Sequence, residues 1–594
     1  MRRLSFLLLI FFVILIPVFL KSQISFQPIP SPKAGEMLYA KHVFFRWNGL
    51  STPSVYTLKL KVSTGFRLEN KTTIPAFIWN EYLDFGDTVY WEVWAKPENS
   101  KTAKDSLIYS SWFGIRALPK SVSSKFRLNV KIPDSTGKEI ILTDMQGLGF
   151  DKKGNIIWYL DRGPNTQQVQ VNRLMDLRLN PDGAITYSSI RITGGKLLRI
   201  TLQNDTIFSY PNDNTPILKG LTFHHNVTPL SNGDYLAIAN AFDGEEMNVK
   251  PGQYRKATQF VIRINKSGKV IWVWQTDAWL KEIDNDCYGH LNSADYDPIA
   301  QEVYVSMKDL NRIVRIDYRT GEVIGEVNGN DPHGPFGGGK AAIARERNPI
   351  LREAQNLQMR KPDLTQQQSF SKEELMKNPV SNFSGQHSMI FSPKDTTLIM
   401  LNNNIDDPLK RPTSVMKIKI PTGKQDKPDI IWNKEIRYED LAPTVSNGQG
   451  AVQITSSGNV FCYMGAVNRM FELDSKQKTK WMALSELYDS TTNQWQSLHG
   501  YKSYMASSLF PVGLVPEIIN LSSGNKVFRI SQIGSDSTKV LVSEVDKKGK
   551  VTSQQELSLS PGTTKDLPVK NNVYSFTICQ LWGDNPCEII KVEK

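Results

Sequence analysis

A short pattern of turn and strand recurs along most of this chain. A turn leads into an apolar run that often ends in tryptophan, as in Lys153–Trp158, Ser267–Trp272 and Pro428–Trp432. Similar runs precede it, for example Ser231–Leu236 and Ser457–Phe461. Helical periodicity is weak almost everywhere, so these runs indicate β-strands. About six four-strand units over residues 123–510 predict a six-bladed β-propeller, with a single large sandwich or barrel as the alternative.

Other segments flank and interrupt the predicted propeller. Residues 1–22 have a basic start and a short apolar run, which predict a secretory signal peptide; a retained N-terminal anchor is the alternative. Short strands predict an N-terminal β-sandwich over residues 23–122 and a small sandwich-like module over residues 511–594. A polar stretch at about residues 336–380, helix-like in part, is expected to be an insertion beside a site. The predicted fold class is all-β.

The positive charge of the chain is spread out and forms no dense block. A net charge of +12 favours anionic small molecules or polyanions in a general way, while a solvated basic surface is the plainer explanation. We see no nucleic-acid motif and expect no nucleic-acid partner. Cys579 and Cys587 are close enough in sequence for a small loop disulfide, which export would permit. We expect a periplasmic or otherwise exported protein with no stable membrane span after signal cleavage.

Histidine is the scarce residue type that points to a site. The chain has seven, and four of them fall in three similar short segments, at His224-His225, His290 and His387, each ahead of a strand-like run. Propeller blades bring their innermost strands together around a central channel, so these imidazoles are expected to converge. Imidazole can act as nucleophile, as general acid or base, and as a donor to developing negative charge.

A metal site is the main rival explanation for clustered histidines. Imidazoles are common ligands for zinc and copper. However, the chain has no HxH or HExxH spacing, and no carboxylate recurs at a matching position. The segment Gly334–Lys340 nearly matches a phosphate-binding loop, but Ala341 stands where that motif needs Ser or Thr. We therefore expect neither a metal nor a cofactor.

The histidine segments resemble signatures of the bacterial arylsulfate sulfotransferases. The most specific match is Gly289–Pro298; residues 224–236 are similar to another signature, and Gln386-His387 to a third. Later segments at residues 450–465 and 501–511 also resemble the family. The resemblance implies a six-bladed propeller that moves a sulfuryl group from an aryl sulfate to a phenol without a nucleotide donor. It also implies a ping-pong route through a sulfated histidine, which is His387 here.

Roles for the other residues follow from this resemblance and from the chemistry of sulfuryl transfer. His290 is expected to protonate the leaving phenolate and deprotonate the acceptor, or to stabilise the sulfuryl oxygens. His225 and Asn292 are expected to donate to those oxygens, with His224 replacing His225 if it is the neighbour that faces inward.

The chain departs from the family at one cation. Lys308 stands where the family usually has an arginine, which keeps the charge but loses the bidentate fork; Arg312 and Arg345 are the candidates to compensate.

Two other functions are open at this point. A non-catalytic surface propeller that binds glycan or protein would fit the flanking sandwiches and the basic charge. An aryl sulfate hydrolase would use the same site with water as acceptor. A homodimer is also possible.

Overall fold

The computed structural model describes residues 30–81, 83–100, 102–162, 173–190, 195–210, 221–242, 257–265, 268–276, 289–329, 382–405, 412–420, 425–436, 446, 448–581 and 587–592. The predicted signal peptide at residues 1–22 and the predicted insertion at about residues 336–380 lie outside these ranges. Within them, no helix has the length and apolar character needed to cross a membrane.

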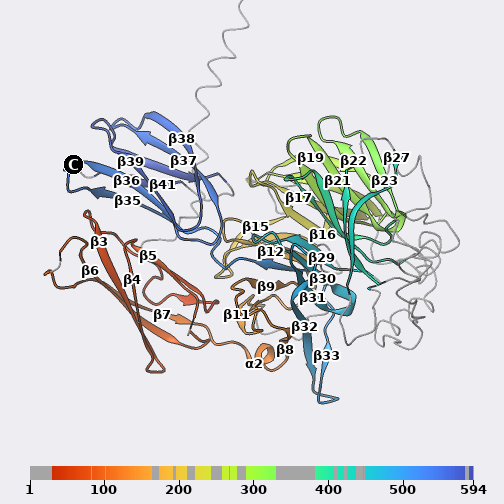
Figure 1. Cartoon of the computed structure of the whole chain (residues 1–594), viewed down its shortest axis with the longest axis horizontal. Helices are drawn as coiled ribbons and strands as arrows, with labels where there is room; N and C mark the ends of the chain where they lie inside the picture. Colours follow the sequence, from red (N-terminus) through yellow and green to blue (C-terminus); the bar gives the residue numbers. More distant parts are fainter. Residues whose placement is uncertain are drawn as a thin grey trace, which may run out of the picture.

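In the described part of residues 126–506, strands form six sheets that are each built from four antiparallel strands (Figure 1). In sheet order they are β34 (Ser503–Ala506), β9 (Ile140–Thr143), β10 (Leu148–Asp151), β11 (Ile156–Tyr159); β12 (Arg173–Leu179), β13 (Ile185–Ile190), β14 (Lys196–Ile200), β15 (Thr206–Tyr210); β16 (Leu221–Pro229), β17 (Tyr235–Phe242), β18 (Ala257–Ile264), β19 (Val270–Gln275); β20 (Leu291–Asp297), β21 (Glu302–Met307), β22 (Arg312–Asp317), β23 (Val323–Asn328); β24 (His387–Ser392), β25 (Thr397–Asn402), β26 (Ser414–Lys419), β28 (Asp429–Glu435); and β29 (Ala451–Ile454), β30 (Val460–Met464), β31 (Arg469–Leu473), β32 (Thr479–Asp489).

The six sheets close into a ring. The first strand of each sheet contacts the first strand of the next, from β34 through β12, β16, β20, β24 and β29 and back to β34. Two pairings between strands that lie far apart in sequence close the ring. β34 pairs with β9 across some 360 residues of sequence, and β8 (Phe126–Ile132) pairs with β32. The predicted six-bladed β-propeller is confirmed, and with it the all-β fold class.

Short extra elements decorate the blades. β27 (Gln425–Asp426) extends the sheet of β20–β23, and β33 (Gln494–Ser497) pairs with β32. A 3-10 helix, η3 (Lys308–Leu310), follows β21, and a second, η4 (Gly465–Val467), follows β30. One short α-helix, α2 (Lys120–Ser123), precedes the ring.

The innermost strands are joined by side chains that bond to the next strand's backbone. Asp176 of β12 accepts from the Val227 amide of β16, and Thr228 donates to the Ala294 carbonyl of β20 at 3.0 Å. The same relation continues around the ring through Ser293 to Met389, Ser388 to Val452 and Gln453 to Met505. The Tyr504 hydroxyl then donates to the Asp176 carboxylate, which completes the circuit between side chains. This circuit satisfies polar backbone groups that no neighbouring strand pairs, and it fixes the blades relative to one another.

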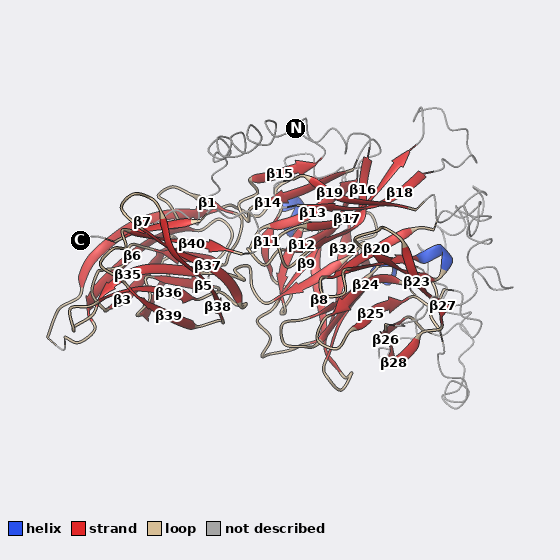
Figure 2. Cartoon of the chain, turned by 90° about the horizontal axis from the view of Figure 1, so that it is seen from above, coloured by secondary structure: helices blue, strands red, loops and turns tan. Residues whose placement is uncertain are grey.

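Two smaller units lie together on one side of the propeller (Figures 1 and 2). The N-terminal unit has a five-stranded and a two-stranded sheet, and the C-terminal unit has a three-stranded and a four-stranded sheet, counted over the described residues. The N-terminal strands are β1 (Met37–Leu38), β2 (Val43–Arg46), β3 (Ser54–Val62), β4 (Arg67–Thr72), β5 (Ala76–Trp79), β6 (Thr88–Pro97) and β7 (Ser106–Ile115). The C-terminal strands are β35 (Leu514–Asn520), β36 (Lys526–Gln532), β37 (Thr538–Val545), β38 (Val551–Leu559), β39 (Thr563–Pro568), β40 (Ser575–Gln580) and β41 (Glu588–Lys591).

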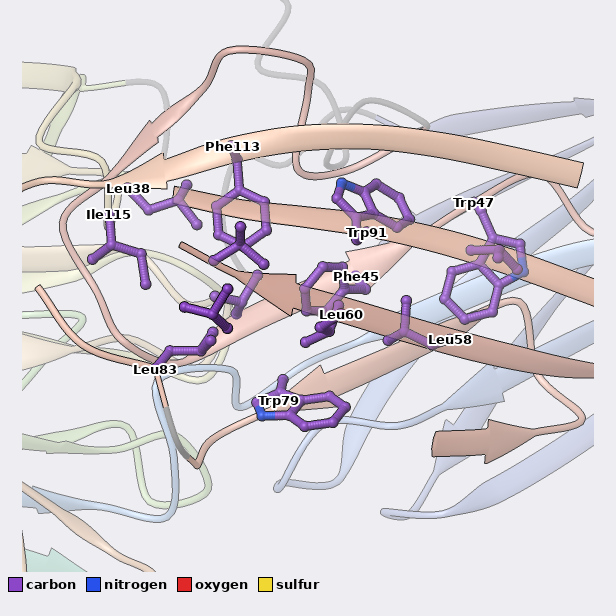
Figure 3. Close-up of a cluster of buried hydrophobic side chains, with 14 of the residues drawn as sticks. Leu38, Phe45, Trp47, Leu58, Leu60, Trp79, Leu83, Trp91, Phe113 and Ile115 are labelled. Carbon is purple, nitrogen blue, oxygen red and sulfur yellow. The ribbon is translucent and has the colours of Figure 1, made fainter. Parts of the chain in front are cut away.

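Each small unit buries its own core. In the N-terminal sandwich, alternate residues of β3 and β6 point inward, and Phe45 meets Trp91 edge-on at 5.2 Å between ring centroids (Figure 3). The C-terminal core stacks Phe528 on Phe576 at 4.2 Å. Alternation of this kind is the expected signature of strands with one face buried. The two flanking β units predicted from the sequence are thus present, while the residue boundaries of the domains stay predictions.

Specific contacts tie the units together. Arg46 of the N-terminal sandwich, which is 1% exposed, pairs with Glu588 of the C-terminal unit at 2.6 Å. Ala40 forms an isolated bridge with Trp158 of the propeller. Cys579 and Cys587 form the small loop disulfide that their spacing suggested.

Candidate active site

The three histidine segments lie on three neighbouring innermost strands. His225 is in β16, His290 directly precedes β20, and His387 begins β24. The rings of His225 and His290 meet nearly perpendicular, at 5.2 Å between centroids. His387 is close enough for its charge to lower the pKa of His225, and the charge of His290 lowers the pKa of His387. Residues that are up to 162 positions apart in sequence, 225 to 387, therefore share one site at the centre of the ring.

Irregular backbone turns these side chains out of the ordinary strand alternation. Each of β16, β20 and β24 has a shift in register with its partner strand next to the histidine. His225 has φ of 58° and His290 has φ of 52°, in the left-handed region that non-glycine residues seldom adopt, and Ser388 beside His387 has φ of 48°. Bulges re-aim side chains, and such outliers gather at functional sites.

The hydrogen bonds of His387 determine which of its nitrogens carries the proton. Its Nδ1 lies 2.9 Å from the Gly385 carbonyl and 2.8 Å from Oδ1 of Asn403. The Asn403 amide nitrogen donates to the Ser446 carbonyl at 2.9 Å, which fixes the amide so that its oxygen faces the histidine. Both partners are acceptors, so Nδ1 must be the protonated nitrogen of the neutral ring. Nε2 then carries the free lone pair.

The surroundings keep His387 neutral. Burial lowers the pKa of His387 to about 3, and the charges of Lys308 and His290 act in the same direction. Burial also lowers the pKa of His224 to about 4 and that of His225 well below its ordinary value, where the other histidines contribute as well. A neutral imidazole is the form that can attack an electrophile. Gly448 lies beside Nε2, because a Cβ added to this glycine would come within 4.0 Å of that nitrogen.

His290 is held by a carboxylate and a short helix. Its Nδ1 lies 3.4 Å from Oδ2 of Asp309, and the other carboxylate oxygen of Asp309 accepts from Nζ of Lys308 at 3.2 Å. The amide of Lys308 donates to the His290 carbonyl at 3.1 Å, and the amide of Asp309 donates to the Gly289 carbonyl at 3.3 Å. Burial would raise the pKa of Asp309, but Lys308 and His290 outweigh it and hold that pKa far below its usual range.

The other residues singled out from the sequence occupy different positions. His224 is buried beside His225, and their Nδ1 atoms are in contact, but it is His225 whose ring meets His290. The Asn292 side chain is fully buried and donates to the Gln386 carbonyl at 2.6 Å, so it holds the peptide next to His387. Arg312 pairs with Glu326 on the adjacent strand at 3.2 Å, and none of the described contacts of the three histidines involves it.

Comparison with known proteins bears on these residues. Residues 131–326 match the family model described as arylsulfotransferase (ASST). The resemblance to the arylsulfate sulfotransferases is confirmed. The match includes His225, His290 and Lys308, and it supports sulfotransferase activity. No curated protein matches the chain.

Solved structures give only distant likenesses to this arylsulfotransferase-like chain. A streptogramin B lyase is 12% identical, with 68% of this chain and 95% of that chain covered and a TM-score of 0.30. A virginiamycin B lyase from Staphylococcus aureus is 13% identical, with 68% and 95% covered and a TM-score of 0.29. Neither likeness bears on the reaction, and the propeller assignment rests on the sheet order given above.

The sequence resemblance to the arylsulfotransferases assigned no role to several residues that lie near the histidines. Tyr501 packs edge-on against His225 at 5.0 Å, is 4% exposed, and its hydroxyl has no hydrogen-bond partner among the described residues. Lys502 is fully buried; its Nζ lies 3.2 Å from Oδ1 of Asp176 and donates to Oδ1 of Asn226 at 3.0 Å. Only the general resemblance of residues 501–511 to the family drew attention to this strand.

The carboxylates and histidines of the site do not gather as metal ligands. Over the ranges that the structure describes, no group of three or more His, Cys, Asp or Glu side chains is placed to hold a metal ion.

Burial lowers the pKa of Lys502 to about 8, against the opposing charge of Asp176, so its ammonium is charged at neutral pH. The site therefore joins neutral imidazoles to buried cations, which suits an anionic substrate.

Proposed function

We propose that this protein is an exported arylsulfate sulfotransferase that needs no nucleotide and works by a ping-pong mechanism through a sulfated His387. The observation that carries the proposal is the fixed tautomer of His387. Two oxygen acceptors, on Gly385 and Asn403, hold the proton on Nδ1 and leave the lone pair on Nε2. A nucleophile prepared in this way needs no base to activate it.

The first half-reaction moves the sulfuryl group from the donor to the enzyme. Nε2 of His387 attacks the sulfur of the aryl sulfate in line, so that an N–S bond forms as the bond from sulfur to the aryl oxygen breaks. The departing phenolate takes a proton from Nε2 of the His290 imidazolium. The enzyme is left with a sulfated His387 and a neutral His290, and a phenol leaves the site.

The second half-reaction reverses these steps on a new acceptor. The phenolic oxygen of the acceptor attacks sulfur and gives its proton to Nε2 of His290. The N–S bond breaks, and the new aryl sulfate leaves with His387 neutral and His290 protonated again. Because the same histidine serves as acid and then as base, no net proton is consumed over the cycle.

Transfer of this kind gains most from donors and charges aimed at the sulfuryl oxygens. The transition state should be loose, with negative charge spread over those oxygens, as in phosphoryl transfer. Lys308 lies close enough to His387 to act on its pKa, and Lys502 lies close enough to His225. Burial raises the pKa of Tyr501 well above 10, so its hydroxyl stays a neutral donor. We assign these three side chains, with His225, to the sulfuryl group.

Export is supported by the chemistry of the chain outside the propeller. The Cys579–Cys587 disulfide is of the kind that persists in oxidising compartments, and it agrees with the signal peptide expected at residues 1–22.

A transfer assay tests the proposed function. We expect the purified protein to release 4-nitrophenol from 4-nitrophenyl sulfate, and to do so faster as a second phenol is added, with one aryl sulfate made per nitrophenol released. No nucleotide is added. Release that is independent of the phenol and yields inorganic sulfate would identify a hydrolase that uses the same histidines. If no aryl sulfate donor releases its phenol, the remaining function is that of a non-catalytic propeller that binds glycan or protein.

A further inference from the structure

The carboxylate of Asp309 stands between two members of the site. Its Oδ2 faces Nδ1 of His290 at 3.4 Å, and its Oδ1 faces Nζ of Lys308 at 3.2 Å. Its side chain is 11% exposed and that of His290 is 23% exposed. The pair is therefore largely shielded from water. In such surroundings a charge acts more strongly on its neighbour than it does at the surface.

The backbone holds Asp309 in this position. Asp309 is the middle residue of η3, and its own amide donates to the Gly289 carbonyl, next to His290. Asn311 caps the C-terminal end of η3; its φ is 49°, and its side-chain oxygen accepts from the Gly385 amide at 2.7 Å. Gly385 also supplies a carbonyl acceptor for His387. One short helix thus fixes the relative placement of His290 and His387.

Other charged and titratable groups face His290 from each packed element. β16 brings His224 and His225, β24 brings His387, and η3 brings Lys308. All of these are neutral or cationic, and each positive charge would oppose the imidazolium form of His290. Among the described groups that act on His290 electrostatically, Asp309 is the anion in direct contact with it.

We propose that Asp309 is a positioning residue for His290. It keeps the Nδ1 proton of His290 in place, directs Nε2 toward the substrate oxygen, and offsets the surrounding positive charge when the imidazolium forms. This inference rests on the function proposed above. The same carboxylate also holds the ammonium of Lys308 beside the site.

The consequence is a dependence on the leaving group. A phenol of high pKa leaves poorly as a phenolate and requires the proton from His290, whereas 4-nitrophenolate leaves without it. Removing the charge of Asp309 should therefore harm the first half-reaction only for poor leaving groups. A role limited to holding the fold would lower the rates for all donors together.

The test compares Asp309→Asn with the wild type on a series of aryl sulfates. We expect about a 10²–10³-fold fall in kcat/KM for phenyl sulfate, within the usual range for a lost general acid, and less than about a 10-fold fall for 4-nitrophenyl sulfate. The slope of log kcat/KM against leaving-group pKa should become steeper, and Asp309→Glu should restore part of the loss. Equal losses for all donors, or no loss for any, would overturn the inference.

Matched controls separate this result from other failures. Asp317→Asn makes the same change on the same blade, where the carboxylate pairs with the exposed Arg319, and it should behave as the wild type. If Asp309→Asn does not fold, ¹⁵N spectra of histidine-labelled wild-type protein serve instead: neutral His290 should carry its proton on Nδ1, and a proton on Nε2 would refute the proposal. A wild type without any transfer would sink the proposed function itself.

Discussion

Replacing His387 by alanine is expected to abolish sulfuryl transfer. Alanine removes the only atom, Nε2, that the proposal allows to bond to sulfur, and neither His225 nor His290 has the same pair of oxygen acceptors fixing its proton among its described contacts. Loss of a catalytic nucleophile can cost on the order of 10⁶ in kcat. The measurement is release of 4-nitrophenol from 4-nitrophenyl sulfate in the presence of phenol.

A matched control makes that result specific. His499 is exposed, and His499→Ala should keep wild-type activity. Thermal unfolding of His387→Ala checks that the propeller is intact, because His387 is buried and its loss leaves Oδ1 of Asn403 without the His387 donor. Undiminished turnover by folded His387→Ala would refute its role as the nucleophile.

Replacing Lys502 by methionine is expected to destabilise the propeller by about 3 kcal/mol, the low end of the cost of breaking a buried ion pair. The Lys502 and Asp176 side chains are both fully buried, and removing the lysine leaves Asp176 with less compensation for its charge. Arg178, 3.0 Å from Asp176, remains and limits the loss. Burial would raise the pKa of Asp176, but Arg178 and Lys502 outweigh it and lower that pKa.

Denaturant unfolding measures this effect, with an exposed pair as control. Lys539 and Glu556 lie 3.0 Å apart on the surface of the C-terminal unit, with 65% and 50% of their side chains exposed. Lys539→Met should change the free energy of unfolding by less than about 1 kcal/mol. If Lys502→Met is no more costly than Lys539→Met, then the cluster around Asp176 does not hold the innermost strands as described.

The strands outside the innermost position of each blade could be predicted from sequence because turns lead into short apolar runs. Lys153–Trp158 leads into β11 and Pro428–Trp432 into β28, each the fourth strand of its sheet, while Ser231–Leu236 leads into β17, a second strand. Successive residues from Tyr235 to Ala239 of β17 are buried, so burial imposes an apolar run there. This repetition was enough to give the number of blades.

The innermost strands could not be predicted in this way. β20 reads Leu-Asn-Ser-Ala-Asp-Tyr-Asp, and its polar side chains bond to the next blade instead of packing in an apolar layer. A shift in register and a residue with positive φ then break the alternation. The histidines were found because their residue type is scarce, not because the strands that carry them were recognised.

The residues that contact the histidines could not be predicted from the sequence for the same reason. Asn403 is 16 residues from His387 in sequence, and it reaches the ring only because β24 and β25 pair in a particular register. Tyr501 meets His225 only after β34 closes the ring. Asn292 shows the converse: its residue type suggested a donor to the substrate, whereas its amide supports the Gln386 carbonyl.

The mass of the donor-treated enzyme tests the central claim most directly. Protein treated with 4-nitrophenyl sulfate without an acceptor, and then kept under basic conditions, should gain the mass of one sulfuryl group. Peptide mapping should place that group on His387, and added phenol should remove it. Transfer that proceeds at full rate with no covalent sulfate, or with sulfate on another residue, would contradict the account.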